Sequence, residues 1–138
     1  MKEGWHGDDY IILWESEERP RITAAYQLAR ALPSCSVLGL KGWDDFIVQD
    51  EACNIWTVPT VPLDLTHAKA FELPNTTQLQ ADERFRNKVK WYVKPLIFGG
   101  DPTHDENLIW VTHEQHAQLV AWWNEQYQAL KAQTSSGA

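Results

Sequence analysis

The sequence of 138 residues has only two cysteines and no long apolar run, and both absences restrict the protein class. Cys35 and Cys53 cannot build a disulfide framework, so we expect reduced, buried thiols in a cytoplasmic protein, with a single bridge as the alternative. No apolar stretch approaches the roughly 20 residues of a membrane-spanning helix. The first ten residues, MKEGWHGDDY, lack the apolar core of a secretory signal. One ordinary globular domain is therefore expected.

Basic residues are also scarce, because 12 Lys and Arg stand against 19 Asp and Glu for a net charge of −7. Residues 1–51 carry ten acidic and five basic residues, a net of −5, whereas residues 52–138 carry nine and seven, a net of −2. Such a field repels nucleic acids and membranes and speeds encounter with a basic protein. Solubility alone is the competing explanation for this acidic bias.

Motifs of catalysis are missing: there is no G-x-S-x-G elbow, P-loop, dinucleotide fingerprint or C-x-x-C. A metal site could recruit three histidines and one aspartate from residues 95–116: His104, His113 and His116 with Asp101 or Asp105. The fragment HEQH has a spacing of three, however, whereas the zinc motif of metalloproteases is H-E-x-x-H. The alternative places His116 in a buried helical stripe, His113 in solvent and His104 in a loop. We therefore expect no enzyme, no metal and no cofactor.

The hydrophobic pattern predicts an α+β fold with a central, largely antiparallel sheet, a few helices packed on it and a long C-terminal amphipathic helix. Short apolar runs predict strands, the second and third of them joined by a tight turn at Lys41–Gly42: residues 9–14, 35–40, 43–50, 54–63 and 107–111. A helix is expected over residues 16–32, with Ser16 as N-cap and Pro20 in its first turn.

The C-terminal helix is expected to begin at Thr112, which forms a capping box with Gln115. Its apolar residues fall on one stripe: His116, Leu119, Val120, Trp123, Tyr127 and Leu130. Residues 64–83 mix helix formers with Pro74 and Asn75, and indicate a loop with short helical turns.

Basic residues alternate with other residue types over residues 84–93, at Arg84, Arg86, Lys88 and Lys90. Period two indicates a strand, but Phe85, Val89 and Tyr92 have helical spacing, so we expect a helix entering the segment and a strand leaving it. Basic and aromatic side chains of residues 84–94 would also suit a nucleic acid. The net charge opposes that function, and lysines on an edge strand serve equally to block edge-to-edge pairing.

Eight tryptophans are many for a small core. Five lie in core-like patterns: Trp14, Trp56, Trp91, Trp110 and Trp123. Trp5, Trp43 and Trp122 do not, and exposed tryptophans beside acids are typical of binding hot spots. Alternatively, these side chains cover the ends of the core. The sequence thus predicts a partner-binding surface formed by Trp43, Asp44, Asp45, Asp50, Glu51 and Trp122.

The stretches GWHGDDYIILWESEE and YQLARALPSCSVLGLKGWDDFIVQD resemble the middle of the SUKH superfamily. The matching elements are Gly4-Trp5, the strand Tyr10 to Trp14, the acidic residues Glu15 to Glu18, Leu32-Pro33 with Leu38-Gly39, and Gly42 with Phe46 to Val48. The ending, PLIFGGDP followed by IWVT and EQHAQLV, is similar to C-terminal segments of such proteins. The usual N-terminal helical third is missing and the usual double glycine is reduced to Gly42, so we expect a divergent or truncated member.

The resemblance implies a mixed α+β domain and a toxin-immunity protein, non-enzymatic and cytoplasmic, that binds and neutralises a bacterial toxin. A basic toxin would agree with the acidic charge. We expect a single SUKH-like domain over residues 1–131 and a flexible polar tail over residues 132–138, with a homodimer as one way of covering an apolar face that the missing third would leave.

Overall fold

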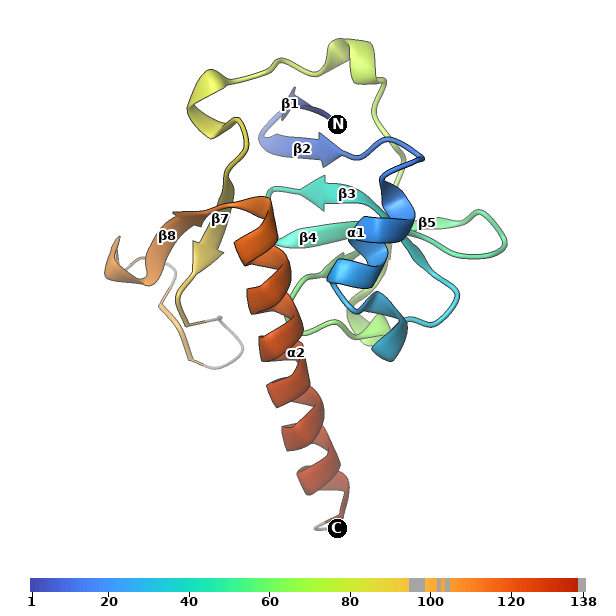
Figure 1. Cartoon of the computed structure of the whole chain (residues 1–138), viewed down its shortest axis with the longest axis vertical. Helices are drawn as coiled ribbons and strands as arrows, with labels where there is room; N and C mark the ends of the chain where they lie inside the picture. The colour runs from blue at the N-terminus through green and yellow to red at the C-terminus, as the bar shows by residue number, and fades with distance from the viewer. Residues whose placement is uncertain (95–98, 102, 104, 137–138) are drawn as a thin grey trace.

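The structure, a computed structural model, describes residues 1–94, 99–101, 103 and 105–136. It confirms the α+β prediction: a six-stranded antiparallel meander and a separate two-stranded ribbon are accompanied by two α-helices in the described part (Figure 1). The meander runs in sequence order through β1 Lys2–His6, β2 Asp9–Leu13, β3 Ser36–Lys41, β4 Asp45–Gln49, β5 Ile55–Pro59 and β6 Lys69–Ala70. The sequence pattern had not indicated β1, which has no apolar run.

The central strands bury both of their faces. Tyr10, Ile12, Leu40, Phe46 and Val48 face the main core, which the helices cover, and Ile11, Leu13, Leu38 and Ile47 form a second cluster on the opposite face. Segments after β5 cover this second cluster with Phe71, Leu73 and Leu79. Burial on two sides explains why these strands are continuous apolar runs instead of alternating ones.

Tight turns set the register of the meander. The turn from β3 to β4 contains Gly42 and Trp43, both in the left-handed region with φ of 58° and 63°. Glycine takes this conformation without strain, as the sequence predicted for Gly42. Gly39 has a different role, because a Cβ built there would lie 1.9 Å from the carbonyl oxygen of Ile12. The close approach of β2 to β3 therefore requires glycine.

The first helix is shorter than expected. α1 spans Arg19–Ala25, its N-cap is Glu18 instead of Ser16, and Pro20 lies in its first turn as predicted. Gln27, with φ of 54°, breaks the helix before a 3₁₀ turn at Leu28–Arg30. The expected continuation of this helix to residue 32 was wrong, because no sequence pattern reliably indicates a glutamine with a positive φ.

The second helix, α2, spans His113–Ser136. The predicted capping box is present: Thr112 Oγ1 accepts from the Gln115 amide at 3.1 Å, and Gln115 Oε1 accepts from the Thr112 amide at 3.0 Å. His116 and Val120 are completely buried. Leu130, however, is 49% exposed, because the C-terminal half of α2 extends beyond the sheet (Figure 1). Within the described ranges, neither helix is long and apolar enough to cross a membrane.

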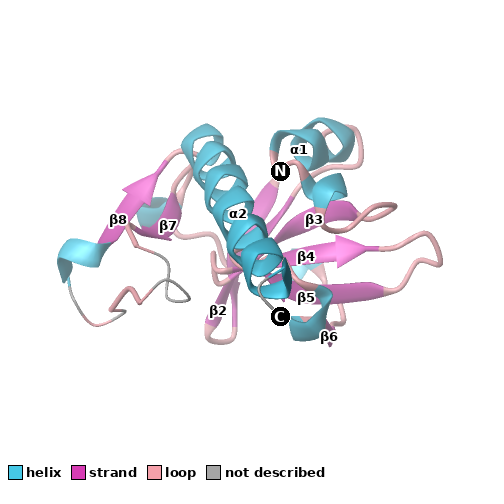
Figure 2. Ribbon diagram, turned by 90° about the horizontal axis from the view of Figure 1, so that it is seen from below, coloured by secondary structure: helices cyan, strands magenta, loops and turns pink. Residues whose placement is uncertain are grey.

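The ribbon consists of β7 Val89–Tyr92 and β8 Leu108–Val111, in the antiparallel arrangement. The strand expected at the end of residues 84–93 is present as β7, but the helix expected at their start is reduced to one 3₁₀ turn at Glu83–Phe85. The loop interpretation of residues 64–83 holds in part: 3₁₀ turns occur at Leu65–His67 and Thr76–Gln78, but β6, which the sequence did not predict, lies between them. β7 lies between β8 and α2 (Figure 2).

Five rings connect the ribbon to the meander, and we call them the aromatic cluster: Trp5, Tyr10, Trp43, Phe85 and Trp110. Trp43 stacks on Tyr10 with 5.0 Å between centroids, and Phe85 stacks on Trp110 at 5.1 Å. Trp110, which its pattern placed in the core, is 40% exposed, because it covers Phe85 from the outside.

Candidate functional site

The six predicted partner-binding residues do not form one surface. Asp44 and Asp45 lie at the start of β4, whereas Asp50 and Glu51 follow its end, about 17 Å away at 3.4 Å per strand residue. Trp122 lies on α2 and is exposed as predicted, with 53% of its surface accessible. The acidic residues at the two ends of β4 therefore form two separate candidate sites.

Trp43 was wrongly expected to be an exposed anchor. Only 7% of it is accessible, because Tyr10, Trp5, Phe85 and Trp110 surround its ring. Its left-handed turn conformation directs the ring onto the sheet end instead of into solvent. Trp43 is therefore part of the packing that positions Asp44 and cannot be inserted into a partner.

Asp44 and Asp45 line a narrow groove of about 160 Å³ with five residues from two other segments: Pro59, Thr60, Val61, Trp91 and Tyr92. β5 supplies the first wall, since Asp45 pairs with Pro59 and the Thr60 amide donates to the Asp44 carbonyl at 2.9 Å. β7 supplies the second wall. The aspartate pair was visible in the sequence, but the aromatic wall was not, because Trp91 and Tyr92 reach it only through docking of the ribbon.

The two carboxylates differ in their partners. Asp44 lies 3.6 Å from Lys90 Nζ, whereas no described cation lies within 4 Å of the Asp45 carboxylate. Burial raises the pKa of both carboxyl groups. Lys90 partly opposes this rise for Asp44, and Lys41 and Lys69 partly oppose it from farther away for Asp45. Asp44 and Asp45 thus both line the groove, but their carboxylates have different basic neighbours, and only that of Asp45 lacks a described cation within 4 Å, which favours the approach of another positive charge.

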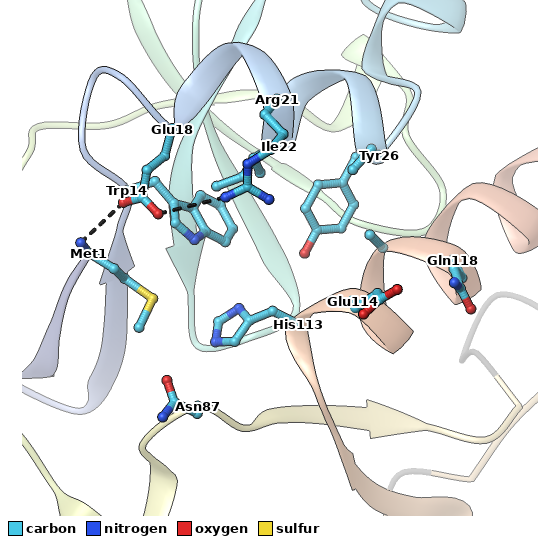
Figure 3. Close-up of a pocket in the computed structure, with 12 residues that line it drawn as sticks. Met1, Trp14, Glu18, Arg21, Ile22, Tyr26, Asn87, His113, Glu114 and Gln118 are labelled. Carbon is cyan, nitrogen blue, oxygen red and sulfur yellow. Dashed lines mark hydrogen bonds and ion pairs between the residues drawn. The ribbon is translucent and has the colours of Figure 1, made fainter.

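A larger cleft, of about 660 Å³, lies elsewhere, between α1 and the first turns of α2. Figure 3 shows Trp14, Ile22 and Tyr26 on one side and His113 on the other. Two acidic side chains line it, Glu18 and Glu114, and Glu18 is already held by the N-terminal ammonium at 3.1 Å and by Arg21 at 3.9 Å. This cleft has room for a ligand, but its opposite charges neutralise each other.

The histidines divide differently from the expectation. His116 is fully buried as predicted, with Nδ1 hydrogen-bonded to Tyr26 Oη at 2.6 Å, and burial lowers its pKa to about 3. His113 was expected in solvent, but both of its ring nitrogens are buried and have no hydrogen-bond partner among the described residues, and burial lowers its pKa. Its ring lies edge-on to Trp14, which explains this burial. His104 is outside the described residues.

Metal-ligating side chains do not gather in the described ranges, where no three His, Cys, Asp or Glu residues are placed to hold an ion. Both cysteines are free. Cys35 is half-buried, but Cys53 is exposed, which corrects the expectation of two buried thiols. Cys53 occupies the turn after β4, where it has a left-handed φ of 67°.

The basic stretch before and within β7 is largely neutralised. Three of its four alternating cations have acidic partners: Arg84 with Asp82 at 2.8 Å, Arg86 with Glu83 at 3.4 Å and Lys90 with Asp44 at 3.6 Å. Its aromatic residues are also engaged, since Trp91 is buried and Phe85 belongs to the aromatic cluster. Few of these groups remain to contact phosphates or stack on bases.

Comparison with known proteins does not assign the chain to a family. No protein-family model matches the sequence, and neither a curated protein nor a solved structure shows significant similarity to it. The groove at the start of β4 and the cleft beside α1 therefore have to be interpreted from their geometry alone.

Proposed function

We propose that the protein is a non-enzymatic binding module, which holds a basic partner protein at the groove of Asp44 and Asp45. The observation that carries this proposal is the unequal pairing of two adjacent, partly desolvated carboxylates. Lys90 serves Asp44, and Asp45 lacks a close cation among the described residues. An incoming Lys or Arg would supply that charge and relieve the repulsion between the two acids.

The shape of the groove favours a long basic side chain. Of the two aromatic residues that line it, Trp91 is buried and Tyr92 is partly exposed, so Tyr92 offers the face that can attract a cation and pack on its methylene groups. A guanidinium could make two parallel hydrogen bonds to one carboxylate. The net charge of −7 would steer such a partner toward the protein from a distance and would repel nucleic acids.

The resemblance to SUKH immunity proteins suggests the partner and its place. On that resemblance we infer a bacterial toxin, basic in charge, that the module binds and blocks in the cytoplasm. This role requires complementary surfaces and no reacting groups, which agrees with a groove that offers charge and aromatic contact.

A capture experiment with two matched double variants tests the proposal. Asp44→Asn/Asp45→Asn removes the charges of the groove, and Asp50→Asn/Glu51→Gln removes the same charge at the other end of β4. Trp43 stays unchanged, because its replacement would disturb the core. We expect a basic protein, identified by mass spectrometry, to be captured by the wild type and the control but lost or weakened at least tenfold with the groove variant.

The second readout is inhibition. The purified module should block the toxic activity of the captured protein in growth or enzymatic assays, and the groove variant should fail to do so. Equal capture by both double variants would exclude the groove as the contact. Capture without any inhibition would refute the immunity role while leaving the groove as a binding surface.

A further inference from the structure

β8 is an edge strand whose side chains are entirely apolar: Leu108, Ile109, Trp110 and Val111. Three of them are substantially exposed, with accessible fractions of 36% for Leu108, 42% for Ile109 and 40% for Trp110. In the described part of the chain, β7 is the only strand that pairs with β8. Exposed edges of this kind are templates for pairing with another strand.

The two edges of the large sheet, in contrast, are protected. The Trp5 amide of β1 donates to the carbonyl of Gln80 at 2.9 Å, and the Gln80 amide returns a bond at 3.2 Å, so a crossing segment covers that edge. β6 is only two residues long and begins with Lys69. Short length, lysine and a covering segment are the usual protections of an edge, and β8 has neither the lysine nor a described covering segment.

The ladder between β7 and β8 determines which main-chain groups of β8 point outward. The Val93 amide donates to the Asn107 carbonyl at 2.8 Å, which makes this a hydrogen-bonded pair. Because such pairs alternate in an antiparallel ladder, Ile109 is bonded to β7, whereas the N–H and C=O groups of Leu108 and Trp110 point away from it. These outward groups are spaced for an additional antiparallel strand.

A second copy of β8 fits this edge in a symmetric register centred on Ile109. Leu108 of one copy would then face Trp110 of the other, and each of these two pairs would exchange two main-chain hydrogen bonds. Ile109 would lie opposite its own equivalent in a non-hydrogen-bonded pair. Leucine beside tryptophan and isoleucine beside isoleucine are favourable cross-strand neighbours, and no like charges oppose each other within the strand.

The charges next to β8 favour the same occupant. In this register Glu106, which precedes β8 and is exposed, approaches Thr112 of the other copy, where α2 begins. A carboxylate is stabilised beside a helix N-terminus, and the symmetry makes the contact twice. The helix N-terminus attracts this carboxylate, Glu114 in the first turn of the same helix partly opposes the attraction, and the balance acts against the general repulsion between two chains of charge −7.

We propose that β8 is a homodimerisation edge, at which two copies join their ribbons into one four-stranded antiparallel sheet around a twofold axis at Ile109. This surface is separate from the groove of Asp44 and Asp45. The second copy covers Leu108, Ile109 and Trp110. Dimerisation at this edge does not depend on the proposed binding of a toxin.

Charge-swap variants test the edge directly by sedimentation equilibrium. The wild type is expected at twice the 15.9 kDa of one chain. Ile109→Lys and Ile109→Glu should each be monomeric, since like charges would meet at the axis, and an equimolar mixture of the two should recover the dimer mass. Val93→Lys is the matched control, because Val93 is 48% exposed but lies outside β8, and it should remain dimeric.

Cross-linking locates the axis. In a background with the exposed Cys53 changed to serine, Ile109→Cys should oxidise to a disulfide-linked dimer, because residues of such a pair lie about 4.5 Å apart between Cα atoms. Val93→Cys should not, since three strand spacings separate the two copies by about 14 Å. A monomeric wild type, a dimer unaffected by Ile109→Lys, or an edge that instead accepts a strand of a different protein would each overturn the proposal.

Discussion

The hydrogen bond between Tyr26 and His116 provides a test of the core. Tyr26→Phe removes the hydroxyl that lies 2.6 Å from Nδ1 of the fully buried imidazole. The phenyl ring keeps its edge-on contact with Phe46, at 4.8 Å between centroids, so packing is preserved. The variant therefore isolates the loss of one buried polar contact.

The expected cost is about 2 kcal/mol of the free energy of unfolding, within the range of about 1–3 kcal/mol for an unsatisfied buried polar group. His116 Nε2 already lacks a partner among the described residues, so neither ring nitrogen would be satisfied. Water does not easily replace the hydroxyl, because the imidazole has no accessible surface. With a typical urea m-value of about 2 kcal/mol per molar, the unfolding midpoint should fall by about 1 M.

Urea unfolding followed by far-ultraviolet circular dichroism measures this loss, with Tyr127→Phe as the control. The Tyr127 hydroxyl donates to Asp64 at 3.1 Å, but Asp64 keeps donors from Thr66 and Lys131. The control should therefore lose less than about 1 kcal/mol. An equal loss in both variants, or a loss below about 0.5 kcal/mol for Tyr26→Phe, would refute the argument.

Two other predictions concern pH and the start of α2. Burial lowers the pKa of His116 from 6.5 to about 3, so between these pH values the unfolded chain binds a proton that the folded chain does not. The free energy of unfolding should therefore be highest above pH 6.5 and should fall by about 2 kcal/mol from pH 7 to pH 5. The lowered pKa of His113 acts in the same direction. His116→Gln should flatten this slope in urea titrations, and an unchanged slope would contradict the assignment. Thr112→Ala should cost about 1 kcal/mol and increase amide exchange in the first turn of α2, whereas Thr112→Ser should cost much less; equal losses would argue against the cap.

Local patterns predicted most of the regular structure. Gly42 marked the turn into β4, and Thr112 with Gln115 marked the start of α2, because each depends on a few neighbouring residues. β1 had no such signal, since KEGWH becomes a strand by pairing with β2. The early end of α1 before Gln27 could not be predicted either, because glutamine seldom adopts a positive φ.

The site was predicted only in part, for a related reason. The doublet of Asp44 and Asp45 was evident from adjacency in the chain. The burial of Trp43 was not, because its neighbours Trp5 and Phe85 come from distant segments and meet only in the folded molecule. Charge patterns therefore indicated the acidic pair that lines the groove, but the walls of the groove required the tertiary structure.

The aromatic cluster also makes the protein an optical reporter of its own assembly. Its rings come from β1, β2, the turn into β4, the turn before β7 and β8, and their centroids lie no more than 6.1 Å apart in the contacting pairs. Fixed neighbouring indoles produce near-ultraviolet dichroism, whereas the strands and helices dominate the far ultraviolet. An intermediate with a formed meander and an undocked ribbon would retain the far-ultraviolet signal and keep only the part of the near-ultraviolet signal that comes from Trp5, Tyr10 and Trp43, so two wavelengths would separate two stages of folding in an unlabelled chain.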